Sequence, residues 1–533
     1  MDDNHKARYA QLLTFLLLPL FYALFYGRYG INETDGGFIT GLAWQLISGK
    51  VLYADVVYVR PPLPVWIRAV ELLLLPDSWA VWGERLLFYL KVAVYCALGA
   101  ALVVPAGRAR WQVTVLSFLL SAHHYPAAAW HTVDGLLCGS LGLWLLFRSS
   151  KYSTTLGGGV LLGAAMLCKQ SFYPMALIGI GMASWAYSWR HGVVAGVGTA
   201  LSWSALAIYL IGTDLWSSFW NMTSGAASPE QAFQHGVVDY FRIRAWVAIA
   251  SALLLIAAVW FSSRRSCSRL ACITWILWLI GLGTVFIWEI QRNGQFTVPF
   301  AQIRLLFWVS NVYALWRGWR NEWPSSFSAR YWALAALSWC AALSWGYNLP
   351  ILFSVPWAFA LWDISRKACI LPSSIARYAS LIAYTGVFFV FYQGYKWIYR
   401  DGHRSEMTVS LGRIFPALSG IYTTPHKAAL YAELAHLAKR YAPNFTVLPS
   451  FPQANFLTRT RPPLPLDWVV RREIGRCEGL VEAEAHRQKP TFFLEKTALP
   501  SLHTNPELAL VRRLYLSGQV IEETAHFIVF RLP

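Results

Sequence analysis

Two carboxylates, Glu33 and Asp35, stand in the polar segment 32–37, which follows the first apolar run of the chain. Acidic side chains in a loop at the edge of an apolar segment could take part in chemistry there. Each also has a structural alternative. Asp35 precedes an apolar stretch with helical spacing and could cap that helix, while Glu33 could be a solvated loop acid. We predict a functional role for Asp35 first and for Glu33 second.

A second cluster of candidate residues lies between the third and fourth apolar runs. It consists of His123, His124, His131 and Asp134. Imidazoles and carboxylates are ligands that divalent metals accept. Their spacing matches no standard metal motif, and histidines at such an edge commonly pair with the backbone or with lipid headgroups. We therefore assign no cofactor, leave a divalent metal as an open alternative, and keep Asp134 as a catalytic candidate that would act without a metal.

The composition places these residues in a membrane protein. Of 533 residues, 56% are hydrophobic and only 14% are charged, and the chain contains 28 tryptophans. This profile is typical of a multispan membrane protein with aromatic residues at both interfaces. The formal net charge of +18 does not indicate nucleic-acid binding, because the basic residues fall in short gaps between apolar runs. That distribution is the one the positive-inside rule gives for cytoplasmic loops.

The apolar runs predict an α-helical polytopic membrane protein with about thirteen spans. The predicted spans cover residues 9–27, 86–104, 111–125, 132–148, 157–170, 172–189, 193–212, 245–261, 270–288, 298–316, 330–346, 350–363 and 378–397. Lys6 and Arg8 precede the first span, and no small-x-small cleavage site follows it. We therefore expect a retained anchor with a cytoplasmic N-terminus and, because the number is odd, an extracytoplasmic C-terminus. The expected location is the plasma membrane, in bacteria the inner membrane.

The predicted transmembrane domain, residues 1–400, contains one unusually long extracytoplasmic loop at residues 29–82. Long ordered loops tend to be functional. Two apolar stretches with helical spacing, one starting at Phe38 and one after Pro62, predict two amphipathic helices that lie in the membrane interface. Together they would build a cleft around the loop acids at the membrane surface.

Hydropathy falls after His403, and residues 401–533 predict a small extracytoplasmic α/β domain. Pro425 begins a stretch with alanines and with leucines at three- and four-residue spacing, which predicts a helix over 425–440. Short runs of β-forming residues predict strands at 445–448, 491–494 and 520–530. The domain shows no catalytic constellation of its own.

The long loop carries a family resemblance. Its pattern Asp-Gly-Gly-Phe-x4-Ala-Trp-x-Leu-x2-Gly-Lys-x-Leu-Tyr-x-Asp starts at Asp35 and is followed by Arg-Pro-Pro-Leu at 60–63. This resembles the first extracytoplasmic loop of C-type membrane glycosyltransferases, such as the protein O-mannosyltransferases, the lipid A aminoarabinose transferase and the Rgt-like bacterial group. Asp134 and the pattern Gly-x3-Gly-x5-Lys ending at Lys169 also match. The resemblance is specific over roughly the first 190 residues and architectural beyond them.

The resemblance implies transfer of a sugar from a polyprenyl-phosphate carrier to an acceptor, with inversion, on the extracytoplasmic face. Asp35 matches the family's loop acid, which implies a general base for the acceptor hydroxyl. The leaving phosphate would need cations. The candidates near extracytoplasmic span ends are Lys169, Arg242, Arg244 and Arg292. Such residues can also snorkel to lipid headgroups, which is how we interpret Lys50 and Arg60.

A membrane transporter or a flippase for lipid-linked glycans is the alternative function. Transporters place ionisable residues near the bilayer midplane and show internal repeats, whereas most acids here lie in loops and no repeat is evident. No loop carries a nucleotide-binding fingerprint, which argues against a sugar-nucleotide donor. The sugar and the acceptor stay open, the acceptor being an envelope glycan, a glycolipid or a protein.

Overall fold

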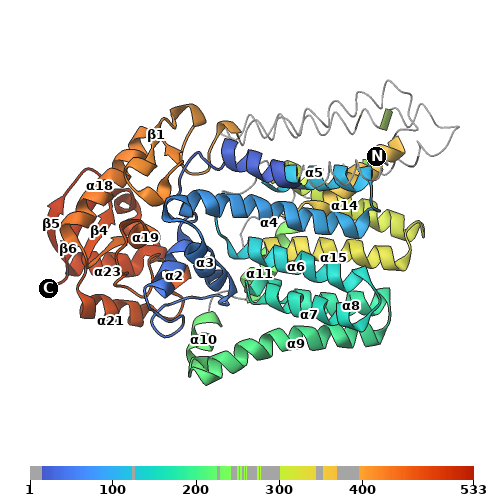
Figure 1. Ribbon diagram of the computed structural model, residues 1–533, viewed down its shortest axis with the longest axis horizontal. Coiled ribbons are helices and arrows are strands. Elements are labelled where there is room, and N and C mark those ends of the chain that lie inside the picture. The colour runs from blue at the N-terminus through green and yellow to red at the C-terminus, as the bar shows by residue number, and fades with distance from the viewer. Residues whose placement is uncertain are drawn as a thin grey trace.

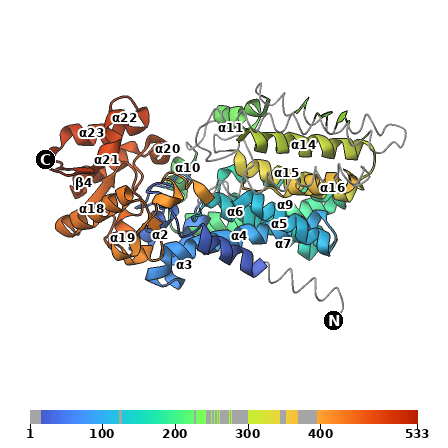
Figure 2. The same ribbon diagram turned by 90° about the horizontal axis from the view of Figure 1, so that it is seen from above.

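The computed structural model describes residues 15–122, 127–224, 229–241, 300–343, 352–368 and 395–533, with scattered helical residues between 249 and 277. A bundle of helices forms one end of the molecule and a mixed α/β region forms the other (Figures 1 and 2). The segment 29–82, which we call the first loop, lies between them. The predicted division into a helical part and a C-terminal α/β part therefore corresponds to two ends of the same molecule.

The bundle is built from apolar helices whose described bounds lie within about six residues of the predicted spans. Residues 15–25 are helical, and the bundle continues with α4 (Ala80–Val103), α5 (Arg108–Ala122), α6 (His131–Arg148), α7 (Tyr152–Met166), α8 (Pro174–Ala186), α9 (Trp189–Gly212), α14 (Phe300–Trp319), α15 (Ser325–Ala342) and α16 (Val355–Ala368). Among the described residues, two helical segments are long and apolar enough to cross a membrane, Asp77–Val103 and Trp189–Gly212. The predicted spans at 245–261, 270–288 and 378–397 lie largely or wholly outside the described residues.

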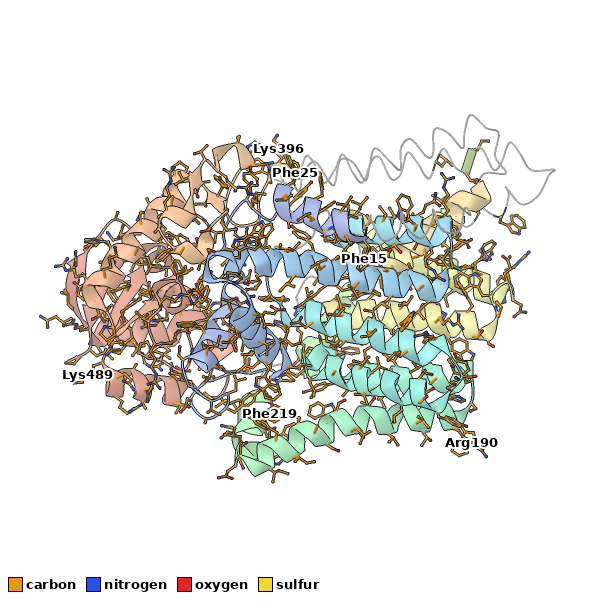
Figure 3. All side chains as sticks on the ribbon, in the orientation of Figure 1. Phe15, Phe25, Arg190, Phe219, Lys396 and Lys489 are labelled. Atoms are coloured by element: carbon orange, nitrogen blue, oxygen red, sulfur yellow. The ribbon has the colours of Figure 1, made fainter. Side chains whose placement is uncertain are left out.

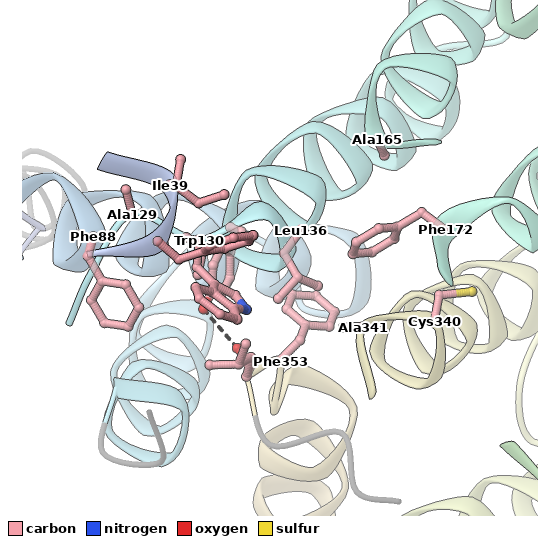
Figure 4. Close-up of a cluster of buried hydrophobic side chains, with 14 of the residues drawn as sticks. Ile39, Phe88, Ala129, Trp130, Leu136, Ala165, Phe172, Cys340, Ala341 and Phe353 are labelled. Carbon is pink, nitrogen blue, oxygen red and sulfur yellow. Dashed lines mark hydrogen bonds between the residues drawn. The ribbon is translucent and has the colours of Figure 1, made fainter. Parts of the chain in front are cut away.

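Short elements stand between the long helices. They are η1 (Asp77–Trp79), at the end of the first loop, and η2 (Gln170–Phe172), α10 (Trp216–Thr223), α11 (Pro229–Gly236) and η3 (Val238–Phe241). Arg190 lies at the far end of the bundle, and Phe219 of α10 lies at the end near the first loop (Figure 3). Apolar side chains of several elements meet behind the loop in one core, among them Trp130, Leu136 and Phe172 (Figure 4).

The first loop contains the two predicted helices, but the environment of the first one differs from the prediction. These helices are α2 (Phe38–Ile47) and α3 (Leu63–Leu74). In α3 one side is exposed, with Leu73 and Leu74 at 71% and 78%. In α2 most residues are buried instead, because the C-terminal region covers it: a Cβ on Gly41 would lie 2.1 Å from the carbonyl oxygen of Pro452. Only a glycine permits that approach, so α2 is an internal helix and not an interfacial one.

The C-terminal region is built on a four-stranded sheet with the strand order β3-β4-β6-β5. Strands β3 (Phe445–Leu448) and β4 (Thr491–Glu495) are parallel, and β4 pairs antiparallel with β6 (Phe527–Arg531), which pairs antiparallel with β5 (Gln519–Glu523). The single strand predicted at 520–530 is thus a hairpin. The sequence does not indicate the break between the two strands, because the turn at residues 524–526 contains none of the usual turn residues Gly, Pro or Asn.

Helices surround this sheet and join it to the first loop. The predicted helix is confirmed as α18 (Pro425–Tyr441), which begins at a Thr424 cap. The remaining elements are β1 (Val409–Ser410), β2 (Tyr422–Thr423), α19 (Ala454–Thr458), α20 (Arg471–Ile474), α21 (Glu478–Gln488), α22 (Leu499–Leu502) and α23 (Ala509–Ser517), with 3-10 turns between them. One of the two cores of the molecule combines residues of this region with Ile31, Ala80 and Val81, so the sheet and the first loop share buried apolar surface.

Candidate functional site

Asp35 is buried in the first loop and does not cap α2. The residue at the N-cap is Gly37, and no side chain bonds to the end of the helix. The backbone of Asp35 is instead fixed by Asn32, whose Oδ1 accepts hydrogen bonds from the N–H groups of Thr34 at 2.9 Å and Asp35 at 3.0 Å. The structural alternative raised by the sequence, a helix cap, is therefore not what holds this carboxylate.

The carboxylate of Asp35 faces a segment that lies more than 350 residues further along the chain. Its Oδ2 accepts a hydrogen bond from the hydroxyl of Tyr399 at 3.1 Å and forms an ion pair with Nη1 of Arg400 at 3.1 Å. The side chain of Asp35 is only 11% exposed, whereas that of Arg400 is 49% exposed. Oδ2 of Asp35, the predicted base, is thus bound by Tyr399 and by the half-exposed Arg400.

Glu33 points to a different partner. Its carboxylate pairs with Nζ of Lys427, in the first turn of α18, at 3.0 Å. The same ammonium donates to the carbonyl oxygen of Ile31 at 2.7 Å. Both side chains of the pair are mostly buried, at 15% and 14% exposed. Glu33 is therefore a contact between the first loop and the C-terminal region, and it does not share the partners of Asp35.

Lys169 is buried between the end of α7 and the 3-10 helix η2, with 4% of its surface exposed. Its Nζ donates a hydrogen bond to Oγ1 of Thr132, in the first turn of α6, at 3.1 Å. The next residue, Gln170, donates Nε2 to the carbonyl oxygen of Val59 at 2.6 Å. Lys169 is thereby held just after the end of α7, next to a residue that contacts the first loop.

Arg60 supplies a second cation to this place. It was interpreted as an interfacial anchor, but its guanidinium forms a two-pronged ion pair with Glu473 of α20, at 2.5 and 2.8 Å, and only 19% of its side chain is exposed. The charges of Arg60 and Glu473 act on Lys169, and those of Lys169 and Arg60 act on His131. Lys169, Arg60, His131 and Thr132 thus form one buried polar group, which we call the cation cluster.

Several polar atoms around the cation cluster have no partner in the structure. They are the hydroxyl oxygens of Tyr58 and Ser171 and Nδ1 of His131, none of which is bonded to a described residue. Tyr58 lies within electrostatic range of Arg60, Glu473 and Asp134. An unpaired buried donor or acceptor costs free energy, so atoms of this kind next to two cations suit a polar, negatively charged ligand.

Phe38 connects the cation cluster with Asp35. It begins α2 three residues after Asp35, and the Arg60 guanidinium lies over its ring at 5.4 Å. The same ring packs against Tyr58 and Trp130, each with centroids 6.3 Å apart. No hydrogen bond or ion pair among the described residues joins Asp35 to Lys169. The two predicted parts of the site therefore lie around the first turn of α2, without direct contact between them.

Asp134 belongs to a buried chain of charges that ties helices together. Lys91 of α4 places its Nζ 2.7 Å from Asp134 and 2.7 Å from Glu71. Glu71 also pairs with Arg68 at 3.3 Å, and Arg68 pairs with Glu84 at 2.5 Å. The chain thus links α6, α4 and α3. Its end reaches the first loop as well, because Glu84 accepts a hydrogen bond from the hydroxyl of Thr40 in α2 at 2.9 Å.

Several predicted site residues fall outside the described residues. These are Arg242, Arg244 and Arg292 among the predicted phosphate ligands and His123 and His124 of the histidine cluster. Of that cluster the structure describes His131 and Asp134, and Asp134 is engaged by Lys91. Within the described part of the chain, no group of three or more His, Cys, Asp or Glu side chains is arranged to hold a metal ion.

Some residues of the site were not found from the sequence. Tyr399, Arg400 and Glu473 reach it from positions hundreds of residues away, and no local pattern marks them. Lys91 did carry a signal, since a charged residue inside a predicted span is expected to be functional or paired.

Comparisons with known proteins identify the fold. No protein-family model and no curated protein matches the sequence. The apo oligosaccharyltransferase of Archaeoglobus fulgidus matches with a TM-score of 0.50 and 12% identity over 98% of this chain and 74% of that chain. Two structures of ArnT from Cupriavidus metallidurans match with 14% identity over 98% of this chain. The apo structure has a TM-score of 0.45 and is covered over 98% of its chain. The structure bound to undecaprenyl phosphate has a TM-score of 0.41 and is covered over 97% of its chain. The chain has the fold of the oligosaccharyltransferase, which fits the helical membrane fold expected from the sequence, while the number of spans stays a prediction.

Proposed function

We propose that this protein is an integral membrane glycosyltransferase that moves a sugar from a polyprenyl-phosphate carrier to an acceptor. The observation that carries the proposal is the arrangement around α2. The buried carboxylate of Asp35 stands three residues before Phe38, whose ring lies under the Arg60 guanidinium, and Arg60 and the buried Lys169 belong to the cation cluster, whose neighbouring polar atoms lack a partner among the described residues. The shared fold with an oligosaccharyltransferase and the loop pattern that begins at Asp35 support the same reaction class.

The proposed reaction is a single displacement at the anomeric carbon. The acceptor hydroxyl attacks this carbon and passes its proton to the carboxylate of Asp35, while the bond from the sugar to the carrier phosphate breaks and its electron pair leaves with the phosphate. Nucleophile and leaving group occupy opposite faces of the carbon, so the configuration inverts. The phosphate gains negative charge as it departs, which fixed cations in a buried site stabilise strongly. Lys169 and Arg60 are the described residues that we assign to this role.

The proposal places the site at the extracytoplasmic face of the membrane. The first loop and the C-terminal region would then lie outside, and the far end of the bundle with Arg190 would lie in the cytoplasm (Figure 3). This orientation follows from the charge of the loops, and it requires a lipid-linked donor, because soluble sugar nucleotides are made in the cytoplasm. Glu33 and Asp134 are assigned positioning roles, since each is engaged by a lysine.

A panel of polyprenyl-phosphate sugars tests the proposal. Membranes that contain the protein are incubated with each radiolabelled donor, and label in acceptor glycans, glycolipids and proteins is measured against the Asp35→Asn variant. We expect transfer from at least one donor by the wild type and a loss of about 10²- to 10⁴-fold in the variant, as removal of a general base typically gives. Asparagine keeps the size of the side chain, so the fold should persist.

The same experiment separates transfer from transport. A flippase would move the labelled lipid across the bilayer of a reconstituted vesicle without forming a new glycosidic bond. Movement of label to the opposite leaflet in wild type and Asp35→Asn alike, with no labelled acceptor in either, would replace the transferase by the transporter. Full transfer by a folded Asp35→Asn variant would remove Asp35 as the base.

A further inference from the structure

The turn at residues 398–402 aims two side chains at one oxygen of Asp35. Tyr399 and Arg400 both contact Oδ2, each at 3.1 Å. Nη1 of Arg400 also donates to the hydroxyl of Thr34 at 2.9 Å. Among the described residues no donor reaches Oδ1 of Asp35, and this atom is not among the buried polar atoms that lack a partner. One oxygen of the carboxylate is therefore occupied and the other is open.

The backbone of this turn is shaped for that contact. Arg400 has a φ of +53°, in the left-handed region. A non-glycine residue held there costs on the order of 1–2 kcal/mol, so the surrounding contacts must hold it in place. The next residue supplies them: Oδ2 of Asp401 accepts hydrogen bonds from the N–H of Ile31 at 2.8 Å and from the hydroxyl of Thr423 at 2.6 Å. The turn is thus fixed to both the first loop and the C-terminal region.

We propose that Tyr399 and Arg400 are positioning residues of Asp35, which hold Oδ2 and leave Oδ1 to accept the proton of the acceptor. This inference rests on the proposed function, because it assigns a partner to the proposed base. It explains why a strained turn from the distant end of the chain contacts this one carboxylate.

The charges around Asp35 decide the direction of the expected effect. The acidic neighbours on the first loop and the turn are Glu33 and Asp401, and Lys427 of α18 pairs with Glu33. Arg85 of α4 donates to the carbonyl oxygens of Gly27 and Gly30, at the start of the loop. Removing Arg400 takes away the one cation that touches Asp35 among the described residues and leaves the acidic neighbours. The carboxylate then takes up a proton at higher pH.

The test is the pH dependence of kcat/KM for sugar transfer. In Arg400→Gln we expect the acid limb to move up by roughly one pH unit, less if solvent screens the half-exposed guanidinium. Relative to the wild type, the variant should lose most activity at pH values on the acid side of the profile, and the loss should become smaller as the pH rises. Arg400→Lys, which keeps the charge, should restore most of the wild-type profile. Tyr399→Phe removes a single oxygen donor and should move the limb in the same direction by a smaller amount.

Arg413→Gln serves as the matched control, because Arg413 is an exposed arginine of the same region without a described contact to the first loop. It should keep the wild-type profile. A uniform loss of activity at every pH in Arg400→Gln, or an unchanged limb in both Arg400→Gln and Tyr399→Phe, overturns the inference. If Arg400→Gln does not fold, Tyr399→Phe alone decides by the same criterion.

Failure of the inference is distinguishable from failure of the proposed function. Asp35→Asn is measured beside the other variants at one pH above the limb. An inactive Asp35→Asn variant together with unchanged profiles in both Arg400→Gln and Tyr399→Phe keeps the base and removes its positioning residues. A fully active Asp35→Asn variant removes the base itself, whatever the profile of Arg400→Gln.

Discussion

Lys91 and Asp134 form a buried ion pair, with Nζ of the lysine 2.7 Å from the carboxylate, between α4 and α6. Asp134 is 2% exposed, so neither water nor lipid can replace this partner. Removing Lys91 leaves Asp134 as an uncompensated buried charge, which costs about 3–5 kcal/mol, whereas removing Asp134 leaves Lys91 paired with Glu71 and should cost less. The pair therefore accounts for Asp134 without any catalytic step.

This pair yields a double-variant prediction. Asp134→Asn alone and Lys91→Gln alone should both lower the melting temperature of the purified protein, and the double variant should recover much of the loss because its amides can bond each other. Sugar transfer should recover together with stability. A double variant that is stable yet inactive would show instead that Asp134 takes part in the reaction.

A second prediction concerns the two cations of the cation cluster. Lys169→Met should lower kcat together with kcat/KM, because a cation that stabilises the departing phosphate acts mainly in the transition state. Binding of the sugar-free polyprenyl phosphate should weaken as well, since charge-assisted bonds in a dehydrated site are strong. Arg60→Gln should show the same pattern and, in addition, release Glu473.

The control for these variants is Arg190→Gln. Arg190 lies at the far end of the bundle from the cation cluster (Figure 3), and its guanidinium lies over the ring of Trp189 at 5.7 Å. Its replacement should leave the kinetics and the binding of polyprenyl phosphate unchanged. Steady-state rates at varied donor concentration, together with binding measurements, check the prediction, and wild-type values in both assays for Lys169→Met would make Lys169 a structural residue.

A third prediction concerns the packing that places Lys169. A Cβ on Gly135 of α6 would lie 2.3 Å from Cε2 of Phe172, which is fully buried and three residues after Lys169. Gly135→Ala should therefore displace η2, reduce stability by about 1–3 kcal/mol and lower transfer. In Gly181→Ala the new methyl group meets no atom within 4 Å, so the same exchange within α8 should be neutral or slightly stabilising. Equal melting temperatures of the two variants would contradict this account.

A fourth prediction follows from a buried acid between the first loop and the C-terminal region. Oδ2 of Asp467 accepts a hydrogen bond from Nε2 of Gln45 at 2.7 Å. Burial raises the pKa of Asp467 to about 7. In the unfolded chain an aspartate has a pKa near 4, so the folded state binds the extra proton between these values. The contribution of Asp467 to stability is thus full below about pH 4 and is lost as the pH rises to about 7.

The measurement compares melting temperatures of the wild type and Asp467→Asn across this pH range. The wild type should lose more stability from pH 4 to pH 7 than the variant, because the amide does not titrate. Glu523→Gln, which changes a largely exposed carboxylate on β5, should keep the wild-type slope. Parallel curves for wild type and Asp467→Asn would contradict the prediction.

The sequence was sufficient for the elements whose signals are local. The helices α6 and α9 lie within four residues of the predicted spans 132–148 and 193–212, because an apolar run and its flanking polar residues define such a helix. The helix at 425–440 was equally clear from Pro425 and the leucine spacing. The place of Lys169 just after the end of α7 also followed from its position in the chain, whereas its contact with Thr132 did not.

Interactions between distant parts of the chain could not be predicted in the same way. Arg60 was interpreted as a lipid anchor because its partner, Glu473, comes 413 residues later. The helix α2 was expected at a membrane interface because its apolar residues need a cover, and the sequence does not say that the C-terminal region provides it. The loop pattern singles out Asp35 as a candidate, but its contacts with Tyr399 and Arg400 depend on a turn that follows a predicted span near the end of the helical part.

The contact between Gly41 and Pro452 sets an order of events during synthesis. About 400 residues separate the two positions, and at about 5–20 residues per second they take on the order of 20–80 s to translate. Throughout that time α2 has already been made, but the C-terminal region that covers it has not yet been made. The chain must therefore keep an apolar helix uncovered while the bundle inserts, and α2 is covered only when the last sixth of the protein has been made. A chain released early would retain Asp35 and Lys169 but lack the surface that encloses them.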